Sequence, residues 1–418
     1  MRTWGKMAQR RKSSNPVARL YRVFRRKAKT LKRMVFPPEL LPFTAESAQG
    51  HKVAVFFADT PSKIYQIAQW IPVFEKAPAH LRPVIITRHT ATTEELQKIT
   101  SLLVVHARTY DLLMQLLELS KFKALIYVNN SYQNFQTLAY QQAAHIHVNH
   151  GESDKISMVS NQSKAYDKVF VAGAAARDRY LSAVAWVDEK KLIPVGRPQL
   201  DLATEPLLEK SALKTITYAP TWEGEDEANN YTSMDCYGMA IIDAAVAQNG
   251  CRVVYKPHPR ILDSKDPLII SAHKYITNKL SRGPHEIHLT GDVLSVLKDT
   301  DLLISDISSV TLDYLYLKPS GAIFLSDRRN NRSELQAESP VALAAYIVDS
   351  STIGELTTSL AKVLSHDELF DKRQEVCRYY FGGIAAGEST AAFYRELEQT
   401  IAQHDTAVSQ LSRVRRSN

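Results

Sequence analysis

Beyond residue 50 the chain alternates short apolar runs with stretches of helical pattern, and this alternation limits the fold more than any other feature. Apolar runs buried on both faces are typical of parallel strands, because the connecting helices cover both sides of the sheet. The first half of the chain therefore predicts a doubly wound α/β sheet. Its strands are expected at Val53–Ala58, Pro83–Thr87, Leu102–His106, Ala124–Val128, His145–Asn149, Val169–Ala172 and Leu192–Val195.

A polar segment, Asp201–Lys214, separates this series from a second one. Two successive α/β halves predict two Rossmann-like domains, residues 50–200 and 212–385, with a cleft between them. Residues 386–418 are expected to form a C-terminal helix and a basic tail. The second series of strands is expected at Thr217–Ala219, Arg252–Tyr255, Glu286–Leu289, Leu302–Ser305 and Ala322–Leu325. Helices are expected, among other places, at Lys63–Phe74, Thr93–Ile99, Gly238–Gln248 and Leu356–Leu364.

The excess positive charge of the chain lies at its start. Residues 1–36 hold thirteen Lys and Arg and no acidic residue, so subtracting 13 from the formal net charge of +8 leaves −5 for the remainder. Residues 1–38 are predicted to be a basic segment on an anionic membrane surface, with an amphipathic helix that begins near Pro16 and ends at Pro37-Pro38, and each cation near the surface contributes ~1 kcal/mol. A disordered basic tail and a nucleic-acid-binding arm are the alternatives. The apolar positions recur in steps of three and four at Val17, Leu20, Tyr21, Phe24, Ala28, Leu31 and Val35.

Several common classes of protein are disfavoured by what the sequence lacks. It has no run of eighteen apolar residues and no apolar run after the basic start, so neither a spanning helix nor a secretory signal is expected. The three cysteines match no disulfide or zinc framework and favour the cytosol. The glycine-rich fingerprints of dehydrogenases and P-loop enzymes are absent.

In open α/β sheets ligands bind beyond the carboxyl ends of the strands, and four polar blocks follow expected strands there. The first runs from His150 through Gly151 to Lys155. The histidine can take a proton from a hydroxyl near neutral pH, and the glycine lets the backbone approach a ligand. A loop histidine with a local hydrogen bond is the alternative. No metal site is expected, because the spacing of His145, His147 and His150 matches no metal motif.

The second block contains Thr221 and Trp222, and this tryptophan can either stack on a nucleotide base or pack at the root of its loop. The third block is Lys256-Pro257-His258-Pro259-Arg260. Its prolines fix the backbone, so His258 is held between two cations that suit a diphosphate. An exposed polar turn is the plainer interpretation.

The fourth block begins at Asp301 and ends at Asp313, with Ser308 and Ser309 at the expected start of a helix. Hydroxyl and free N–H groups at a helix start bind phosphate well. Simple capping of the helix by the serines is the alternative.

Taken in order, the four blocks resemble the motifs of the CDP-glycerol glycerophosphotransferase family of teichoic-acid and capsule synthesis. The resemblance covers roughly residues 50–385, and the ordered set is more specific than any single block. The matching positions are His150, Gly151 and Lys155, then Pro220, Thr221 and Trp222, then Lys256, Pro257, His258 and Pro259, and finally Asp301, Ile304, Asp306, Ser308, Ser309 and Asp313.

The resemblance implies a GT-B-type fold, an N-terminal acceptor domain, a C-terminal donor-nucleotide domain, and chemistry without a metal or cofactor. His150 would be the general base for the acceptor hydroxyl, and His258 would contact the donor diphosphate and stabilise developing charge. The other residues implied at the donor diphosphate are Lys256, Arg260, Asp306, Ser308 and Ser309. Those implied in nucleotide or substrate binding are Gly151, Lys155, Thr221, Trp222 and Asp313.

The implied partners are a CDP-glycerol or CDP-polyol donor, a lipid-linked or polyol-phosphate acceptor, and the cytoplasmic face of the bacterial plasma membrane, with no nucleic acid. Three departures from the family pattern, at Glu223, Ile307 and Arg197, leave the polyol and the acceptor open. A nucleotide-sugar glycosyltransferase of the same fold is the first alternative. A non-enzymatic basic adaptor for membrane or nucleic acid is a remote one.

Overall fold

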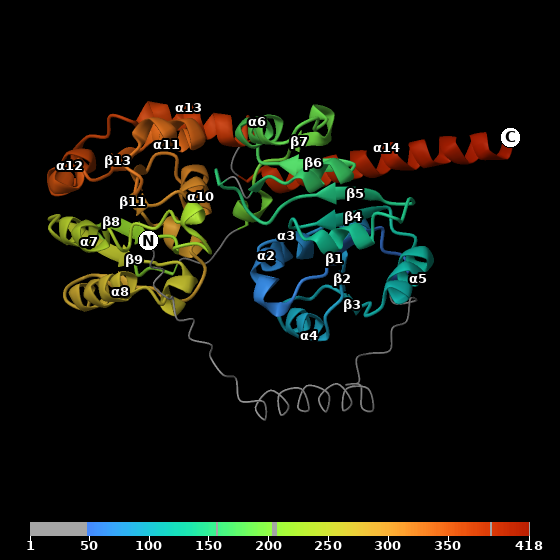
Figure 1. The fold of residues 1–418 in the computed structure, drawn as a ribbon, viewed down its shortest axis with the longest axis horizontal. Helices are drawn as coiled ribbons and strands as arrows, with labels where there is room; N and C mark the ends of the chain where they lie inside the picture. Colours follow the sequence, from blue (N-terminus) through green and yellow to red (C-terminus); the bar gives the residue numbers. More distant parts are fainter. Residues whose placement is uncertain (1–47, 156–157, 203–206, 385–386, 418) are drawn as a thin grey trace, which may run out of the picture.

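The computed structural model describes residues 48–155, 158–202, 207–384 and 387–417, so the predicted basic helix at the N-terminus lies outside the described residues. Two parallel α/β units stand side by side, each built around its own sheet (Figure 1). The prediction of two Rossmann-like domains in one chain is confirmed.

The first sheet has seven parallel strands, and its central strands are buried along their whole length. Its strands are β1 (Val53–Phe57), β2 (Val84–Thr87), β3 (Val104–His106), β4 (Ala124–Tyr127), β5 (Ala144–His147), β6 (Lys168–Val171) and β7 (Leu192–Pro194). Their order is β3-β2-β1-β4-β5-β6-β7. Burial on both faces explains why these strands are continuous apolar runs rather than alternating ones.

The second sheet has six parallel strands in the order β10-β9-β8-β11-β12-β13. They are β8 (Lys214–Ala219), β9 (Cys251–Tyr255), β10 (Glu286–Ile287), β11 (Leu302–Ser305), β12 (Ala322–Ser326) and β13 (Tyr346–Val348). The sequence did not predict β13, because this edge strand has only three residues, two of them half-buried, and so leaves little apolar pattern.

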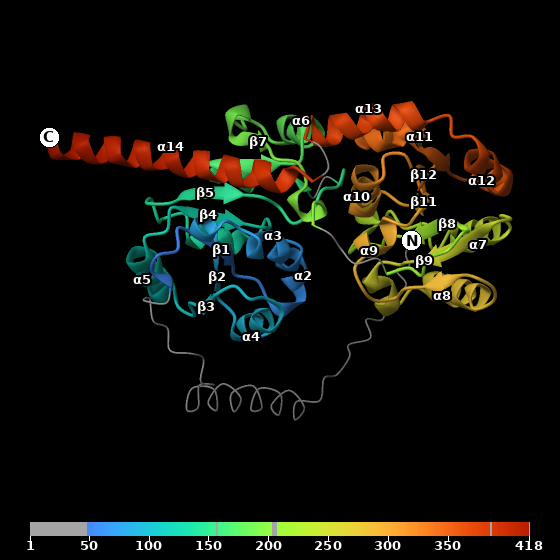
Figure 2. The same ribbon diagram turned by 180° about the vertical axis from the view of Figure 1, so that it is seen from behind.

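Helices connect the strands and cover both sheets (Figure 2). The first domain contains α2 (Ile64–Ala68), α3 (Ile71–Glu75), α4 (Thr90–Ile99), α5 (Tyr110–Ser120) and α6 (Ala174–Ala183). The second contains α7 (Gly238–Val246), α8 (Pro267–Leu280), α9 (Leu294–Leu297), α10 (Ser309–Leu317), α11 (Arg332–Glu338), α12 (Leu356–Ser365) and α13 (Phe370–Phe381).

One predicted helix, Lys63–Phe74, is in fact two short ones, α2 and α3, with a break at Gln69 and Trp70. Pro72 explains the break, because a proline has no N–H to continue the helical bonds and its ring crowds the preceding turn. The break turns the buried Trp70 indole toward β5, where it donates a hydrogen bond to the carbonyl of Asn149.

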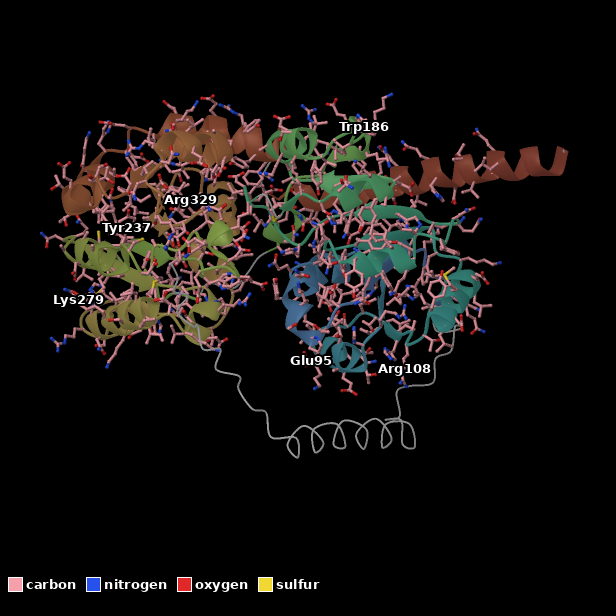
Figure 3. All side chains as sticks on the ribbon, viewed as in Figure 1. Glu95, Arg108, Trp186, Tyr237, Lys279 and Arg329 are labelled. Carbon is pink, nitrogen blue, oxygen red and sulfur yellow. The ribbon has the colours of Figure 1, made fainter. Side chains whose placement is uncertain are left out.

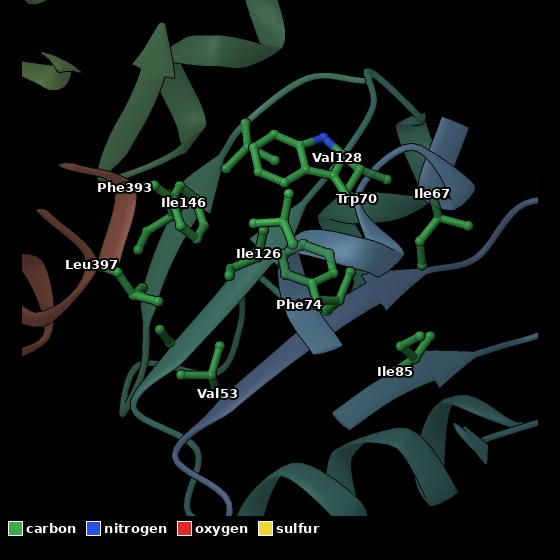
Figure 4. Close-up of a cluster of buried hydrophobic side chains, with 14 of the residues drawn as sticks. Val53, Ile67, Trp70, Phe74, Ile85, Ile126, Val128, Ile146, Phe393 and Leu397 are labelled. Atoms are coloured by element: carbon green, nitrogen blue, oxygen red, sulfur yellow. The ribbon is translucent and has the colours of Figure 1, made fainter. Parts of the chain in front are cut away.

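The last helix, α14 (Ser389–Ser417), leaves the second domain and packs on the first. Its Phe393 and Leu397 join the core cluster that contains Trp70, Phe74 and Ile146 (Figure 4). Burial of each such side chain contributes about 1.5–3 kcal/mol. The N-terminal domain is therefore assembled from two separate stretches of the chain.

The two domains also share an apolar junction. Ala172, Ala175 and Leu200 of the first domain lie in the same buried cluster as Leu312 and Tyr380 of the second. None of the described helices is long and apolar enough to cross a membrane.

Candidate active site

The N-terminal half of the site lies where β5 ends. The strand stops at His147, and Asn149 takes a left-handed backbone conformation with φ of 54°. Asparagine tolerates this conformation better than most residues, and such strained positions cluster at functional sites. The Asn149 side chain accepts a hydrogen bond from the N–H of His150, at 2.9 Å, so the turn sets the direction in which His150 leaves the sheet.

The two ring nitrogens of His150 differ in their surroundings, and Nδ1 is the buried one. This nitrogen has no hydrogen-bond partner among the described residues, and the edge of the ring meets Tyr65 with ring centroids 6.0 Å apart. Burial, together with the positive charges of Arg197 and Lys63, lowers the pKa of His150 to about 4. At neutral pH the ring is therefore uncharged and has a lone pair to accept a proton.

The metal alternative at β5 finds no support in the positions of the other two histidines. His145 is bonded to the hydroxyl of Tyr127 and the carbonyl of Tyr140, and His147 is fully buried and stacks on Tyr166. Within the described ranges no group of three or more His, Cys, Asp or Glu side chains is placed to hold a metal ion.

The register of the second sheet aligns the ends of the strands that precede the other three blocks. Ala219 at the end of β8 lies opposite Ser305 of β11, and Tyr218 lies opposite Tyr255 of β9. The residues that follow these strands therefore leave the sheet at the same edge, which is the edge that parallel sheets use for ligands.

His258 is held by the backbone on both sides. Its N–H donates to the carbonyl of Pro220 at 3.0 Å, and its Nδ1 accepts from the N–H of Arg260 at 3.2 Å. Because a backbone N–H can only donate, the neutral imidazole must carry its proton on Nε2. Burial, with the charges of Lys155, Arg260 and Lys256, lowers the pKa of His258 to about 4, so this Nε2–H tautomer is the form present at neutral pH.

Trp222 packs beside this turn. The guanidinium of Arg260 lies 3.6 Å from the centre of the Trp222 ring, and the ring stacks loosely on His258 with centroids 6.1 Å apart. A cation over an indole face contributes about 0.5–2 kcal/mol. The structure thus brings the second and third blocks together, with Arg260 over one face of the Trp222 ring.

The side chain of Asp306 points into the protein interior, below the loop that contains Thr221. It is fully buried, and its carboxylate accepts hydrogen bonds from the N–H of Thr221 and the hydroxyl of Ser326. Burial raises its pKa to about 6. Asp306 thus fixes the loop that carries Thr221, and its contact with the donor diphosphate stays a prediction.

Ser308 and Ser309 stand at the start of α10. Ser308 is the N-cap residue but makes no side-chain cap bond, and its buried hydroxyl has no partner among the described residues. Simple capping thus does not account for Ser308. An unused hydroxyl beside the first N–H groups of a helix is well suited to bind a phosphate oxygen.

Asp313, which was predicted to take part in substrate binding, forms an ion pair between the two domains, and its role in binding stays a prediction. Its carboxylate lies 2.5 Å from the guanidinium of Arg197, and both side chains are almost fully buried. Burial raises the pKa of Asp313 to about 6, against the opposing effect of Arg197. Sequence reasoning noted Arg197 only as a departure from the family pattern, although its place just after β7 follows the same strand-exit rule as the other blocks.

The segment from Gly151 to Lys155 belongs to the first domain and contacts the second. Glu152 and Asp154 both pair with the half-buried Arg179 of α6, at 2.6 Å each, and Gly151, Glu152, Arg179 and Arg197 line a small pocket. The Lys155 ammonium lies 5.2 Å from the centre of the Tyr231 ring, in the second domain.

A second cation near Tyr231 is Arg329, which Figure 3 labels on the second domain, and its guanidinium lies 4.6 Å from the ring centre. Neither Tyr231 nor Arg329 lies in a sequence block that suggested function. Their signal in the sequence was weak, because each belongs to a loop whose contacts depend on how the loops fold together.

The fold is that of a two-domain α/β protein of the GT-B type, with histidine, basic and hydroxyl side chains beyond the carboxyl ends of strands in both sheets. The family model described as CDP-Glycerol:Poly(glycerophosphate) glycerophosphotransferase matches residues 81–380. The chain belongs to this family and is a glycerophosphotransferase enzyme.

Solved structures agree on the fold at low sequence identity. A putative UDP-N-acetylglucosamine 2-epimerase from Listeria monocytogenes is 14% identical, with a TM-score of 0.57 over 83% of this chain and 96% of that one. The wall teichoic acid polymerase TagF is also 14% identical, with a TM-score of 0.53 over 92% of this chain and 98% of that one. A histidine variant of TagF soaked with CDPG has a TM-score of 0.51, over 92% of this chain and 98% of that one, at 14% identity. A search of curated proteins gives no significant match.

Proposed function

We propose that the enzyme transfers glycerol phosphate, or a related polyol phosphate, from a CDP-activated donor to a hydroxyl of a lipid-linked or polymeric surface-polysaccharide acceptor, with release of CMP. The observation that carries the proposal is the pair of neutral histidines at strand exits of the two domains. His150 offers a lone pair in the first domain, and His258 offers an Nε2–H in the second.

The reaction is a displacement at the β-phosphorus of the donor. A bond forms between the acceptor oxygen and this phosphorus, and the bond to the oxygen that bridges the two phosphates breaks. The electron pair of the broken bond leaves with CMP, and the acceptor proton passes to Nε2 of His150. Such a base contributes typically 10²–10⁴-fold in rate.

The donor side of the site holds hydrogen-bond donors and a cation that are already in place before the phosphates bind. The Nε2–H of His258 donates to a phosphate oxygen, Lys256 adds a nearly buried ammonium, and the hydroxyl of Ser308 stands unused at the helix start. Burial lowers the pKa of Lys256. Fixed donors in a site that excludes water stabilise developing phosphate charge much more than they would in bulk solvent.

The acceptor side is also positively charged. Arg197 and Lys63 act on His150, and the Nε of Arg197 is buried without a partner among the described residues. These cations favour an acceptor that carries phosphate close to its reacting hydroxyl, as a polyol-phosphate terminus does. The likeness in fold to a TagF variant soaked with CDPG supports a CDP-glycerol donor.

The enzyme is proposed to work at the cytoplasmic face of the membrane, held there by residues 1–38. The support is the sequence pattern of thirteen cations and an apolar stripe within residues 1–36. Removal of residues 1–36 is expected to shift the protein from the membrane fraction to the soluble fraction. The circular dichroism spectrum of the shortened chain should still be that of a folded α/β protein. Unchanged membrane retention of the shortened chain would contradict this attachment.

The reaction itself is tested by incubating the enzyme with CDP-glycerol and lipid-linked or polyol-phosphate acceptors. The expected result is CMP release matched by a mass increase of one or more glycerol phosphate units on the acceptor. CDP-ribitol in a parallel reaction tests the choice of polyol. Release of a nucleoside diphosphate from a nucleotide sugar, without reaction of either CDP donor, would instead establish a glycosyltransferase.

A further inference from the structure

The carboxylate of Asp154 makes the hydrogen bonds by which residues 150–155 of the first domain contact the second domain. Only 3% of its side chain is exposed. One oxygen lies 2.6 Å from the guanidinium of Arg179 in its own domain, and the other accepts hydrogen bonds from the hydroxyls of Ser339 and Tyr380 in the second domain. A buried charge is tolerated when it is paired in this way, and removal of its partners is strongly destabilising.

The residue after Asp154 enters the proposed donor site. The ammonium of Lys155 lies over Tyr231, its pKa is lowered by burial and partly restored by Asp306, and its charge is the strongest single one acting on His258. A lysine of the acceptor domain therefore stands beside the histidine of the donor domain.

Side chains, rather than backbone pairing, set the path of this segment. Residues 150–155 form neither helix nor strand. The carboxylate of Asp154 is the group in this segment that contacts both domains directly, and it precedes Lys155 by one residue. Its position thus fixes the point from which the lysine side chain extends.

We propose that Asp154 is a positioning residue that places Lys155 in the donor-phosphate site, which makes this cation available only while the two domains are in contact. The inference rests on the proposed function, since it takes the surroundings of His258 to be the donor site. It assigns Asp154 no contact with substrate. Its effect on the donor passes entirely through Lys155.

The plainer possibility is that Asp154 merely holds the domains together, and the chain contains a matched control for it. Asp178 of α6 accepts a hydrogen bond at 2.9 Å from the hydroxyl of Tyr379, the neighbour of Tyr380 on α13. This second aspartate–tyrosine bond crosses the same junction. It is exposed, and among the described residues neither of its partners is hydrogen-bonded to residues 150–155.

The test measures the affinity for CDP-glycerol, without acceptor, in the full-length enzyme and its variants by calorimetry. Asp154→Ala and Lys155→Ala are each expected to weaken binding about tenfold, and the double variant no more than either one, because contacts that act as a unit are not additive. Asp154→Asn keeps an oxygen for Ser339 and Tyr380 and is expected to lose less. Asp178→Ala is expected to leave the affinity unchanged.

A ligand-free measurement keeps the inference testable if Asp154→Ala folds poorly. Tyr380→Phe removes one hydroxyl from Asp154, and it is expected to speed hydrogen exchange in residues 150–155 and to weaken CDP-glycerol binding several-fold. Additive losses in the double variant, or an equal loss in Asp178→Ala, would overturn the inference. If the wild-type enzyme bound no CDP-glycerol, the proposed function would fail first, and the role of Asp154 at the donor would fail with it.

Discussion

His150 and His258 each lie beyond the end of a parallel strand, β5 in the first domain and β9 in the second, and yet the structure prepares them differently. Each follows a buried parallel strand, and burial with nearby cations lowers the pKa of both to about 4. The Nδ1 of His258 is occupied by a backbone N–H, whereas the Nδ1 of His150 has no partner among the described residues. A similar lowering of the pKa thus does not decide the task of a histidine. The hydrogen bond at Nδ1 fixes His258 as an Nε2–H donor, whereas no such bond within the described residues fixes the tautomer of His150.

The largest expected effect distinguishes these two histidines directly. His150→Ala should lower turnover roughly 10²–10⁴-fold, because the acceptor hydroxyl loses its base. Its affinity for CDP-glycerol should barely change. His258→Ala should lower both turnover and affinity for CDP-glycerol or CMP, because it removes a phosphate contact. Steady-state rates and calorimetry on the purified variants measure both quantities.

The matched control for these variants is His80→Ala, which removes a half-exposed histidine paired with Glu398 far along the chain. It should retain wild-type turnover, and circular dichroism should confirm that all three variants are folded. Near-normal turnover of His150→Ala would refute the assignment of the base. Equal losses of CMP affinity in the His150 and His258 variants would show that both histidines serve the donor.

The second prediction concerns the contribution of the buried interdomain ion pair to stability. Asp313→Ala leaves Arg197 buried without its partner, and it should lower the free energy of unfolding by about 3–5 kcal/mol. Asp405→Ala breaks the exposed pair with Lys123 and should lower it by about 1 kcal/mol or less. Urea denaturation measures both values. Similar small losses in the two variants would mean that the interdomain pair does not depend on its burial.

The third prediction concerns the pH at which each histidine charges. Because the pKa of His150 is about 4, its base form persists well below neutrality, and kcat/KM should stay level from pH 7 to about pH 5 before falling toward pH 4. A histidine at its ordinary pKa would begin to lose activity near pH 6.5. An acid limb centred near 6.5 would therefore contradict the burial of His150.

The smallest expected effect is a shift in the pKa of His150, which different cations surround than surround His258. Lys63 disfavours the protonated form of His150, so Lys63→Gln should raise the pKa of His150 by about 0.3 at low salt. The pKa of His258 should not move, because its perturbing charges are Lys155, Arg260 and Lys256. NMR titration of the two imidazoles measures both, with the exposed Lys98→Gln as the control.

Much of this arrangement follows from local sequence rules. Parallel sheets align the carboxyl ends of their strands, so Trp222, His258 and Ser308 were expected at one edge, and they lie there. The pairings of Arg197 with Asp313 and of Asp154 with Tyr380 were not predicted. Their partners come from different domains, and no local pattern records how two separately folded surfaces meet.

The same reason explains why the structural contacts of two block residues were not predicted. A carboxylate in a motif has the same sequence signature whether it faces a ligand or the interior of the protein. Asp306 fixes the loop that carries Thr221, and Asp313 pairs with Arg197 of the other domain, and both contacts depend on the packed structure.

The return of α14 to the first domain has a consequence for the order in which the protein is made. Phe393 and Leu397 complete a core whose other members, such as Trp70 and Ile146, are synthesised more than two hundred residues earlier. Domains generally fold as they emerge from the ribosome, beginning with the N-terminal one. Here the second domain emerges whole while the first still exposes the apolar surface that α14 will cover. The N-terminal domain is therefore synthesised first but completes its core last. Until α14 is made, its exposed apolar surface is a binding site for a chaperone during translation.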